Sequence, residues 1–147
     1  MDTAILVSAC LAGMPCRYDG KAQPNKEIIE KVKRGEAVVC CPETSGGLPT
    51  PRVPAEIIGG DGNSVLDGRA KVVTSEGRDV TNEYIKGAQD ALKTAREKGI
   101  HKAILKAKSP SCGCGVIYDG SFTGSKKAGD GVTAALLKRN GVQVESV

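Results

Sequence analysis

Aromatic residues are scarce in this chain, which has no Trp, one Phe and three Tyr among its 147 residues. Proteins that bind single-stranded nucleic acid stack bases on aromatic rings, so this scarcity argues against that class. The net charge of +4 comes from scattered Lys, Arg, Asp and Glu rather than from one basic stretch. Dedicated nucleic-acid binders usually concentrate positive charge on one face. A nucleic-acid partner is therefore not favoured.

Long hydrophobic runs are also missing, and none approaches the roughly 20 apolar residues that a membrane-spanning helix needs. The first residues, MDTAILVSAC, have an acidic second position and no basic stretch, unlike a secretory signal peptide. We therefore expect a cytoplasmic protein without a membrane segment. In a reducing compartment, the six cysteines indicate metal binding or catalysis before disulfides.

The hydrophobic pattern predicts short buried strands that alternate with amphipathic helices. The expected strands are 4–8, 37–41, 102–107 and 142–145, and the expected helices are 24–34, 81–98 and 131–139. Such alternation is typical of a parallel sheet with helices on its faces. Two further strands, 55–58 and 65–74, predict a β-hairpin. We thus predict one α/β domain over residues 1–147, with a mostly parallel sheet, helices on both faces and a small β-hairpin insertion.

Two segments are predicted to be long loops without regular structure. Residues 42–54 contain four prolines, which helix and strand interiors do not tolerate. Residues 108–129 are rich in Ser, Gly and Asp. Long loops inside a compact domain are usually functional, so we expect the site to involve both segments.

Four of the six cysteines lie in segments rich in Gly, Pro or Ser or at strand ends, namely Cys10, Cys16, Cys41 and Cys112. The carboxyl ends of parallel strands meet at one edge of a sheet, so Cys10, Cys41 and Cys112 should gather there. Thiolates favour zinc, copper(I) or iron–sulfur clusters. The chain has no CxxC pair and a single histidine, His101, which we place at a sheet edge. The pattern predicts a metal or cluster site, with a catalytic thiol or inert cysteines as alternatives.

Acid–base groups stand close to these cysteines in the sequence. Glu43 follows Cys41 by two residues, and Ser109 precedes Cys112 by three. A carboxylate and a hydroxyl would thus lie beside any metal that the cysteines hold. Neighbouring strand residues face opposite ways, so Cys40 is expected to point away from the site and pack as a small apolar residue.

Five motifs resemble the family long catalogued as domain of unknown function 523, whose characterised members are thiouracil desulfidases. They are SACLAGMPCRYDGK, VCCPETSGGLPTPRVPAEI, GRDVTNEYIKGA, AILKAKSPSCGCGVIYDGSFTG and GDGVTAALLKRNG. The resemblance runs through essentially the whole chain. Thr44 and Ser45 stand where a pair similar to Gln-Leu is expected, so one part of the pocket wall differs from the family pattern.

The resemblance implies an oxygen-sensitive [4Fe–4S] cluster that three cysteines hold, with the fourth iron lacking a protein thiolate. The family's cysteine motifs match at Cys10, Cys16, Cys41 and Cys112, one more than three ligands require. Because strand ends converge, we favour Cys10, Cys41 and Cys112 as ligands, with Cys16 as the alternative ligand.

The resemblance also implies the activity, a non-redox desulfuration of thiolated pyrimidines that converts 2-thiouracil to uracil and sulfide. The open iron would bind the thiocarbonyl sulfur as a Lewis acid. Glu43 matches the family's acidic residue and would act as general base on a water, while Ser109 would donate or relay a proton. Two alternatives stay open: a structural zinc or iron–sulfur protein closed by four cysteines, and desulfuration of thiolated tRNA bases. A cysteine-nucleophile hydrolase is disfavoured because His101 is poorly placed as its base.

Overall fold

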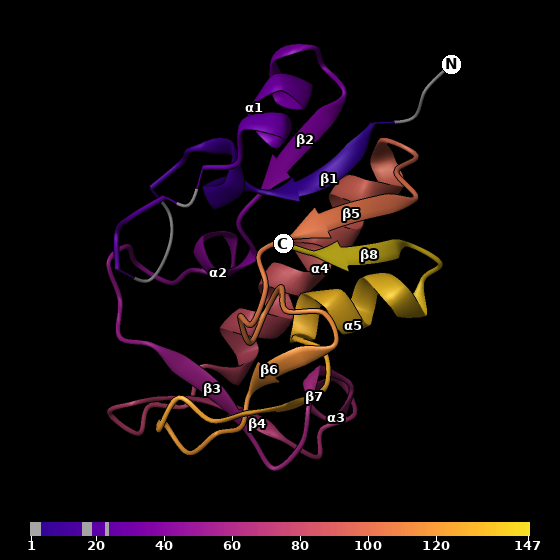
Figure 1. Cartoon of the computed structure of the whole chain (residues 1–147). Coiled ribbons are helices and arrows are strands. Elements are labelled where there is room, and N and C mark those ends of the chain that lie inside the picture. Colours follow the sequence, from indigo (N-terminus) through magenta and orange to yellow (C-terminus); the bar gives the residue numbers. More distant parts are fainter. Residues whose placement is uncertain (1–3, 16–18, 23) are drawn as a thin grey trace.

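Four parallel strands form the central sheet in the order β2-β1-β5-β8 (Figure 1). The structure is a computed structural model that describes residues 4–15, 19–22 and 24–147. The strands are β1 (Ile5–Ser8), β2 (Ala37–Cys40), β5 (Lys102–Leu105) and β8 (Gln143–Ser146). Each lies within about two residues of the predicted strand. The predicted α/β class with a mostly parallel sheet is confirmed.

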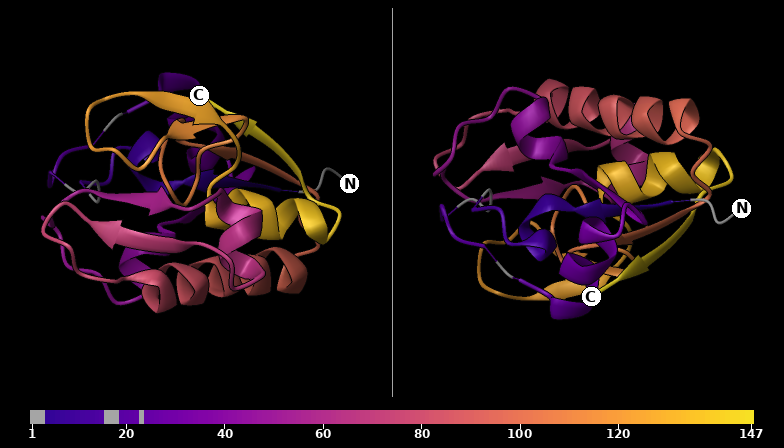
Figure 2. Two further views of the ribbon diagram at one scale, coloured as in Figure 1. Left: turned by 90° about the horizontal axis from the view of Figure 1, so that it is seen from below. Right: turned by 90° about the horizontal axis from the view of Figure 1, so that it is seen from above.

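Helices cover both faces of this sheet, as the sequence predicts. On one face, Leu6 and Leu105 pack against α4 (Thr81–Glu97) and α5 (Val132–Arg139). On the other face, Val7 packs in a separate cluster with Ile28 of α1 (Lys26–Lys33). Leu6 and Val7 face opposite ways because successive strand residues alternate. Figure 2 shows the sheet between these two helical layers.

Two antiparallel hairpins lie beside the sheet, in the lower part of Figure 1. The first joins β3 (Ala55–Ile58) to β4 (Lys71–Thr74), which confirms the predicted hairpin insertion. The second joins β6 (Val116–Tyr118) to β7 (Lys126–Ala128). Both rest on a third apolar cluster, to which Ile57, Val72 and Ile117 contribute together with α4 and α5.

Several elements differ from the sequence prediction. The short helix α3 (Gly62–Leu66) occupies part of the segment expected to be a strand, because Asp61 caps its first turn by accepting from the Ser64 amide at 3.1 Å. Helix α1 begins at Lys26 rather than at residue 24, since the Asn25 side chain accepts from the Ile28 amide at 3.2 Å and acts as N-cap.

The two segments predicted as loops also contain regular structure. Helix α2 (Pro42–Ser45) opens the proline-rich segment, because proline is well tolerated in the first turn, where an amide hydrogen has no intrahelical partner. Outside these two segments, the 3₁₀ helix η1 (Ala9–Ala12) follows β1 directly. Strands β6 and β7 are not predicted from the hydrophobic pattern, because each is three residues long and only Ile117 among their residues is buried.

Each strand that contributes to the candidate site ends at the same edge of the sheet, where the arrowheads gather in Figure 1. Strand β1 leads into η1 with Cys10, β2 leads into α2 with Cys41, and β5 leads into the loop with Cys112. Among the described residues, no helix is long and apolar enough to cross a membrane.

Candidate functional site

A cavity of about 440 Å³ lies at this edge. Its volume falls in the range of roughly 300–1,000 Å³ that is typical of small-molecule sites. The lining includes three predicted ligands, Cys10, Cys41 and Cys112, and both predicted catalytic residues, Glu43 and Ser109. The structure therefore brings together five of the six residues that sequence reasoning selected. The sixth, the alternative ligand Cys16, lies outside the described residues.

The three cysteines reach the cavity from three different elements. Cys10 lies in η1 and Cys112 in the loop after β5, and both are buried. Cys41 is the N-cap of α2 and is half-buried, with its Sγ 3.1 Å from Thr44 Oγ1. No disulfide joins any two cysteines in the part of the chain that the structure describes. Over the same residues, no three His, Cys, Asp or Glu side chains meet at one metal-ion position.

Cys40 departs in part from the sequence expectation. It packs against the core cluster between the sheet, α4 and α5, as predicted for a small apolar residue. It also lines the cavity, next to Cys41. Strand alternation does not separate the two cysteines, because β2 ends at Cys40 and the backbone turns into α2 at Cys41.

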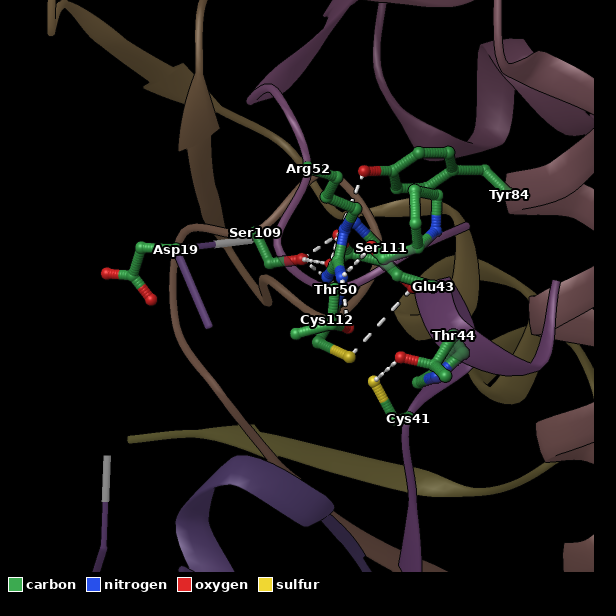
Figure 3. A network of polar contacts seen from close by, with 12 residues as sticks. Asp19, Cys41, Glu43, Thr44, Thr50, Arg52, Tyr84, Ser109, Ser111 and Cys112 are labelled. Atoms are coloured by element: carbon green, nitrogen blue, oxygen red, sulfur yellow. Dashed lines mark hydrogen bonds and ion pairs between the residues drawn. The ribbon is translucent and has the colours of Figure 1, made fainter. Parts of the chain in front are cut away.

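Glu43 is the centre of the hydrogen-bond network in this cavity (Figure 3). Its Oε2 accepts from Arg52 Nε at 3.1 Å, from a terminal guanidinium nitrogen of Arg52 at 2.8 Å, and from the Tyr84 hydroxyl at 3.0 Å. Its Oε1 accepts from the Ser109 hydroxyl at 3.1 Å. The carboxylate is thus held by one residue of its own segment and by two residues that are distant in the sequence.

The Ser109 hydroxyl is oriented by the backbone of its own loop. Its Oγ accepts from the amides of Ser111 at 3.0 Å and Cys112 at 3.1 Å. Because a hydroxyl has one proton and two acceptor lone pairs, these contacts direct its proton to Glu43. The same hydroxyl therefore links the candidate base to the backbone of a candidate ligand.

Helix α5 fixes the loop that carries Ser109 and Cys112. The first amides of the helix donate to carbonyls of this loop, from Val132 to Pro110 at 2.7 Å and from Thr133 to Ser111 at 2.9 Å. The Ser111 and Thr133 hydroxyls lie 2.7 Å apart and both residues are fully buried. The first amides of a helix have no acceptor within the helix, and the carbonyls of this loop accept their hydrogen bonds.

Helix α2, which carries Glu43, packs on α4 through glycine. A Cβ atom on Gly87 would overlap the carbonyl of Pro42, and one on Gly46 would overlap the carbonyl of Glu83. The two backbones therefore touch directly, which no larger residue permits. This contact places Glu43 beside Tyr84, one turn before Gly87 on α4.

The buried network shifts the pKa values of its members. Burial and the Glu43 carboxylate together raise the pKa of Tyr84 well above 10.0. Burial alone would lower the pKa of Arg52, but the Glu43 charge and hydrogen bonds outweigh it, so the pKa is raised. Burial, and then Glu43, raise the pKa of the Cys112 thiol to about 12. Tyr84 and Arg52 thus remain hydrogen-bond donors at neutral pH.

Sequence reasoning did not select Arg52 or Tyr84. Tyr84 lies in the segment 81–98, which the hydrophobic pattern predicts as an amphipathic helix, and it is 2% exposed, but its hydroxyl reaches Glu43. Arg52 is the one cation of the predicted loop over 42–54, which is the only signal for it in the sequence. His101 is exposed just before β5 and is not part of the cavity lining, as expected.

Comparison with known proteins now identifies the family. The sequence profile of the 2-thiouracil desulfurase family matches residues 5–147. The chain belongs to this family. It is 53% identical over 142 residues to the uncharacterized protein YbbK of Bacillus subtilis (strain 168), covering 97% of this chain and 94% of that protein. The resemblance read from the five motifs is confirmed.

A solved structure gives the same fold. This chain is similar to a [4Fe-4S]-dependent thiouracil desulfidase named TudS (DUF523), with a TM-score of 0.86 and 46% identity. The match covers 98% of this chain and 90% of that chain. This chain is therefore homologous to a [4Fe-4S]-dependent thiouracil desulfidase over nearly the whole length of this chain.

Proposed function

We propose that this chain removes sulfur from a thiolated pyrimidine by hydrolysis, converting 2-thiouracil and water into uracil and hydrogen sulfide. The observation that carries the proposal is one cavity whose lining includes Cys10, Cys41 and Cys112 together with the hydrogen-bonded pair Glu43–Ser109. The reaction replaces a C=S bond by a C=O bond whose oxygen comes from water. No electrons are transferred, so the reaction needs no reductant.

Cys10, Cys41 and Cys112 would hold a [4Fe–4S] cluster of the kind on which TudS depends. The donor set fits this group, because cysteine thiolates are the usual ligands of such clusters and three cysteines from three strand ends line one cavity. When three cysteines bind it, the cluster supplies one iron without a protein ligand, a Lewis acid for the thiocarbonyl sulfur. Cys16 stays the alternative ligand.

Glu43 would act as the general base. It takes a proton from a water whose oxygen bonds to the ring carbon that carries sulfur. The C–S bond then breaks, and the sulfur leaves with both water protons as hydrogen sulfide. Ser109, already hydrogen-bonded to Glu43, would relay a proton between the carboxylate and the departing sulfur or the ring nitrogen.

The proposal is tested by anaerobic reconstitution of the full chain, with iron and acid-labile sulfide measured before 2-thiouracil is added. We expect about four of each per chain. Uracil and sulfide should then appear in equal amounts without reductant, and uracil formed in H₂¹⁸O should carry the label. The matched Glu43→Gln variant should keep the cluster and lower kcat about 10²–10⁴-fold, the range for loss of a general base, which leaves a residual rate that can be measured.

Three outcomes would contradict the proposal in different ways. Zinc in place of iron would favour a structural site closed by four cysteines. A cluster that leaves 2-thiouracil intact but desulfurates thiolated tRNA would change the substrate class. Unlabelled uracil in H₂¹⁸O would exclude direct hydrolysis.

A further inference from the structure

We infer that Tyr84 and Arg52 are positioning residues, which bind Oε2 of Glu43 and leave Oε1 as the atom that takes the proton from water. The inference deepens the proposed function and rests on it. Neither residue touches the substrate in this scheme. Both act through the Glu43 carboxylate, and they assign different tasks to its two oxygens.

The assignment follows from the acceptor capacity of each oxygen. An ionised carboxylate offers about four lone-pair positions, two on each oxygen. Oε2 already accepts three hydrogen bonds, two from Arg52 and one from Tyr84, so its acceptor positions are used. Among the described residues, Oε1 accepts from Ser109 alone. Oε1 therefore keeps one position for the proton of a water.

The donors to Oε2 are fixed by burial and by their own contacts. The Arg52 side chain is 7% exposed and the Glu43 side chain 16%, so the ion pair is shielded from solvent. Arg52 also donates to the Pro49 carbonyl at 3.1 Å and to Thr50 Oγ1 at 3.2 Å. Tyr84 lies in α4, and the backbone of α4 contacts the backbone of α2, which carries Glu43. Because Arg52 in a loop and Tyr84 in a helix both donate to Oε2, the Glu43 carboxylate cannot rotate freely.

Removal of either donor should let the carboxylate turn. In Tyr84→Phe, Oε2 loses one of its three donors while the aromatic ring still fills its place. In Arg52→Lys, the positive charge stays but the two-pronged guanidinium contact is lost. Both variants should lower kcat, because Oε1 no longer faces the attacking water, and they should leave KM close to its wild-type value.

The test is a double-mutant cycle in reconstituted protein. We expect Tyr84→Phe to lower kcat about tenfold, the effect of one hydrogen bond to a charged group, with KM changed less than about twofold and the iron content unchanged. In a Glu43→Gln background, the same substitution should have no further effect on kcat. Arg78→Lys is the control, an exposed arginine that pairs with Glu83 outside the cavity, and it should keep full activity.

Unchanged kcat in Tyr84→Phe, or a full tenfold loss that persists in the Glu43→Gln background, would overturn the inference. A crystal structure of Tyr84→Phe decides the question without activity. We expect the Glu43 carboxylate to have rotated and its contact with Ser109 to be lost, whereas an unmoved carboxylate would overturn the inference. Wild-type protein that binds the cluster but does not turn over 2-thiouracil would contradict the proposed function, and the crystal structure would still decide the positioning role.

Discussion

The Ser109 hydroxyl donates to Oε1 of Glu43 at 3.1 Å, which joins two residues 66 positions apart in the sequence. Glu43 lies on α2 after strand β2, and Ser109 lies in the loop after β5. Strand β1 separates those two strands in the sheet. The bond therefore forms only when the sheet has its parallel order and both loops rise from the same edge.

Substitution of Ser109 tests whether this bond takes part in the reaction. Ser109→Ala should lower kcat about a hundredfold, the low end for loss of a group in general acid–base catalysis. The amides of Ser111 and Cys112 also lose their acceptor, so the free energy of unfolding should fall by about 1–3 kcal/mol. Steady-state kinetics and denaturant unfolding measure both effects. Ser75→Ala is the control, because Ser75 is an exposed serine after β4, and it should change neither kcat nor the free energy of unfolding. A kcat near the wild-type value in Ser109→Ala would exclude the relay role.

Much of the fold could be predicted from the sequence because its signals are local. The strands and the helix α4 carry hydrophobic periodicity over enough residues to be recognised, and the parallel order then follows from their alternation. Gathering of Cys10, Cys41 and Cys112 could be predicted for the same reason, since strand ends in a parallel sheet share one edge. These predictions need no knowledge of side-chain contacts.

The rest depends on contacts between distant segments. Tyr84 carries the signal of a core residue, and only the packing of α2 on α4 brings its hydroxyl to Glu43. Arg52 lies in a proline-rich segment that has no hydrophobic periodicity, so the sequence does not predict where its side chain lies. Strands β6 and β7 are three residues each, too short for a periodic pattern, and Ile117 of β6 is buried by elements far along the chain. No local pattern encodes such a contact.

The proposed ligands can be separated from the other cysteines by metal content. Ser substitutions of Cys10, Cys41 or Cys112 should each lower the iron bound after anaerobic reconstitution, because each removes one thiolate. Cys114→Ser is the control, since Cys114 donates to the Val144 carbonyl at 3.5 Å and does not line the cavity. Cys16→Ser should keep both iron and turnover if three ligands suffice. Loss of iron in Cys16→Ser would instead make Cys16 a ligand, as the fourth if the other three variants also lose iron, or in place of the cysteine whose variant keeps it.

Gly87 offers a test in which two effects have opposite signs. Ala is favoured over Gly inside a helix by about 1 kcal/mol, so propensity alone predicts that Gly87→Ala stabilises α4. The structure predicts the reverse, because the new Cβ would overlap the Pro42 carbonyl and overpacking costs about 1–3 kcal/mol. Thermal unfolding should show a lower Tm and kinetics a lower kcat, as α2 carries Glu43. Gln89→Ala is the control, because Gln89 is exposed on the same helix, and it should not lower the Tm. A higher Tm in Gly87→Ala would disprove the backbone contact.

Tyr84 should also affect stability at alkaline pH. Its pKa is raised by burial and by Glu43 in the folded state, whereas in the unfolded chain it titrates near 10. Above pH 10, the unfolded state therefore loses a proton that the folded state keeps, and the stability that Tyr84 contributes is progressively lost. The difference in Tm between wild type and Tyr84→Phe should stay level from pH 8 to about 9 and shrink as the pH rises above 10. Since all other groups are common to both proteins, a constant difference would contradict the raised pKa.

Glu56 should control the order of the loop between β6 and β7. The residue is 8% exposed, and its Oε1 accepts from the amides of Gly120 at 2.9 Å and Phe122 at 3.2 Å. Phe122 has a φ of 58°, a backbone conformation that costs energy for a bulky residue and needs support from its surroundings. The loop contributes Gly124 to the cavity wall, so Glu56 holds that wall in place.

Glu56→Ala leaves both amides without this acceptor. We expect hydrogen exchange across residues 119–125 to become at least about tenfold faster, and KM for 2-thiouracil to rise as the cavity wall loosens. Glu56→Gln is the matched variant, because its amide oxygen still accepts from the backbone while the charge is removed. If exchange is as slow in Glu56→Ala as in wild type, the loop is held by other contacts. If Glu56→Gln loosens the loop as much as Glu56→Ala, charge rather than the acceptor position stabilises the loop, since charged acceptors form the stronger hydrogen bonds.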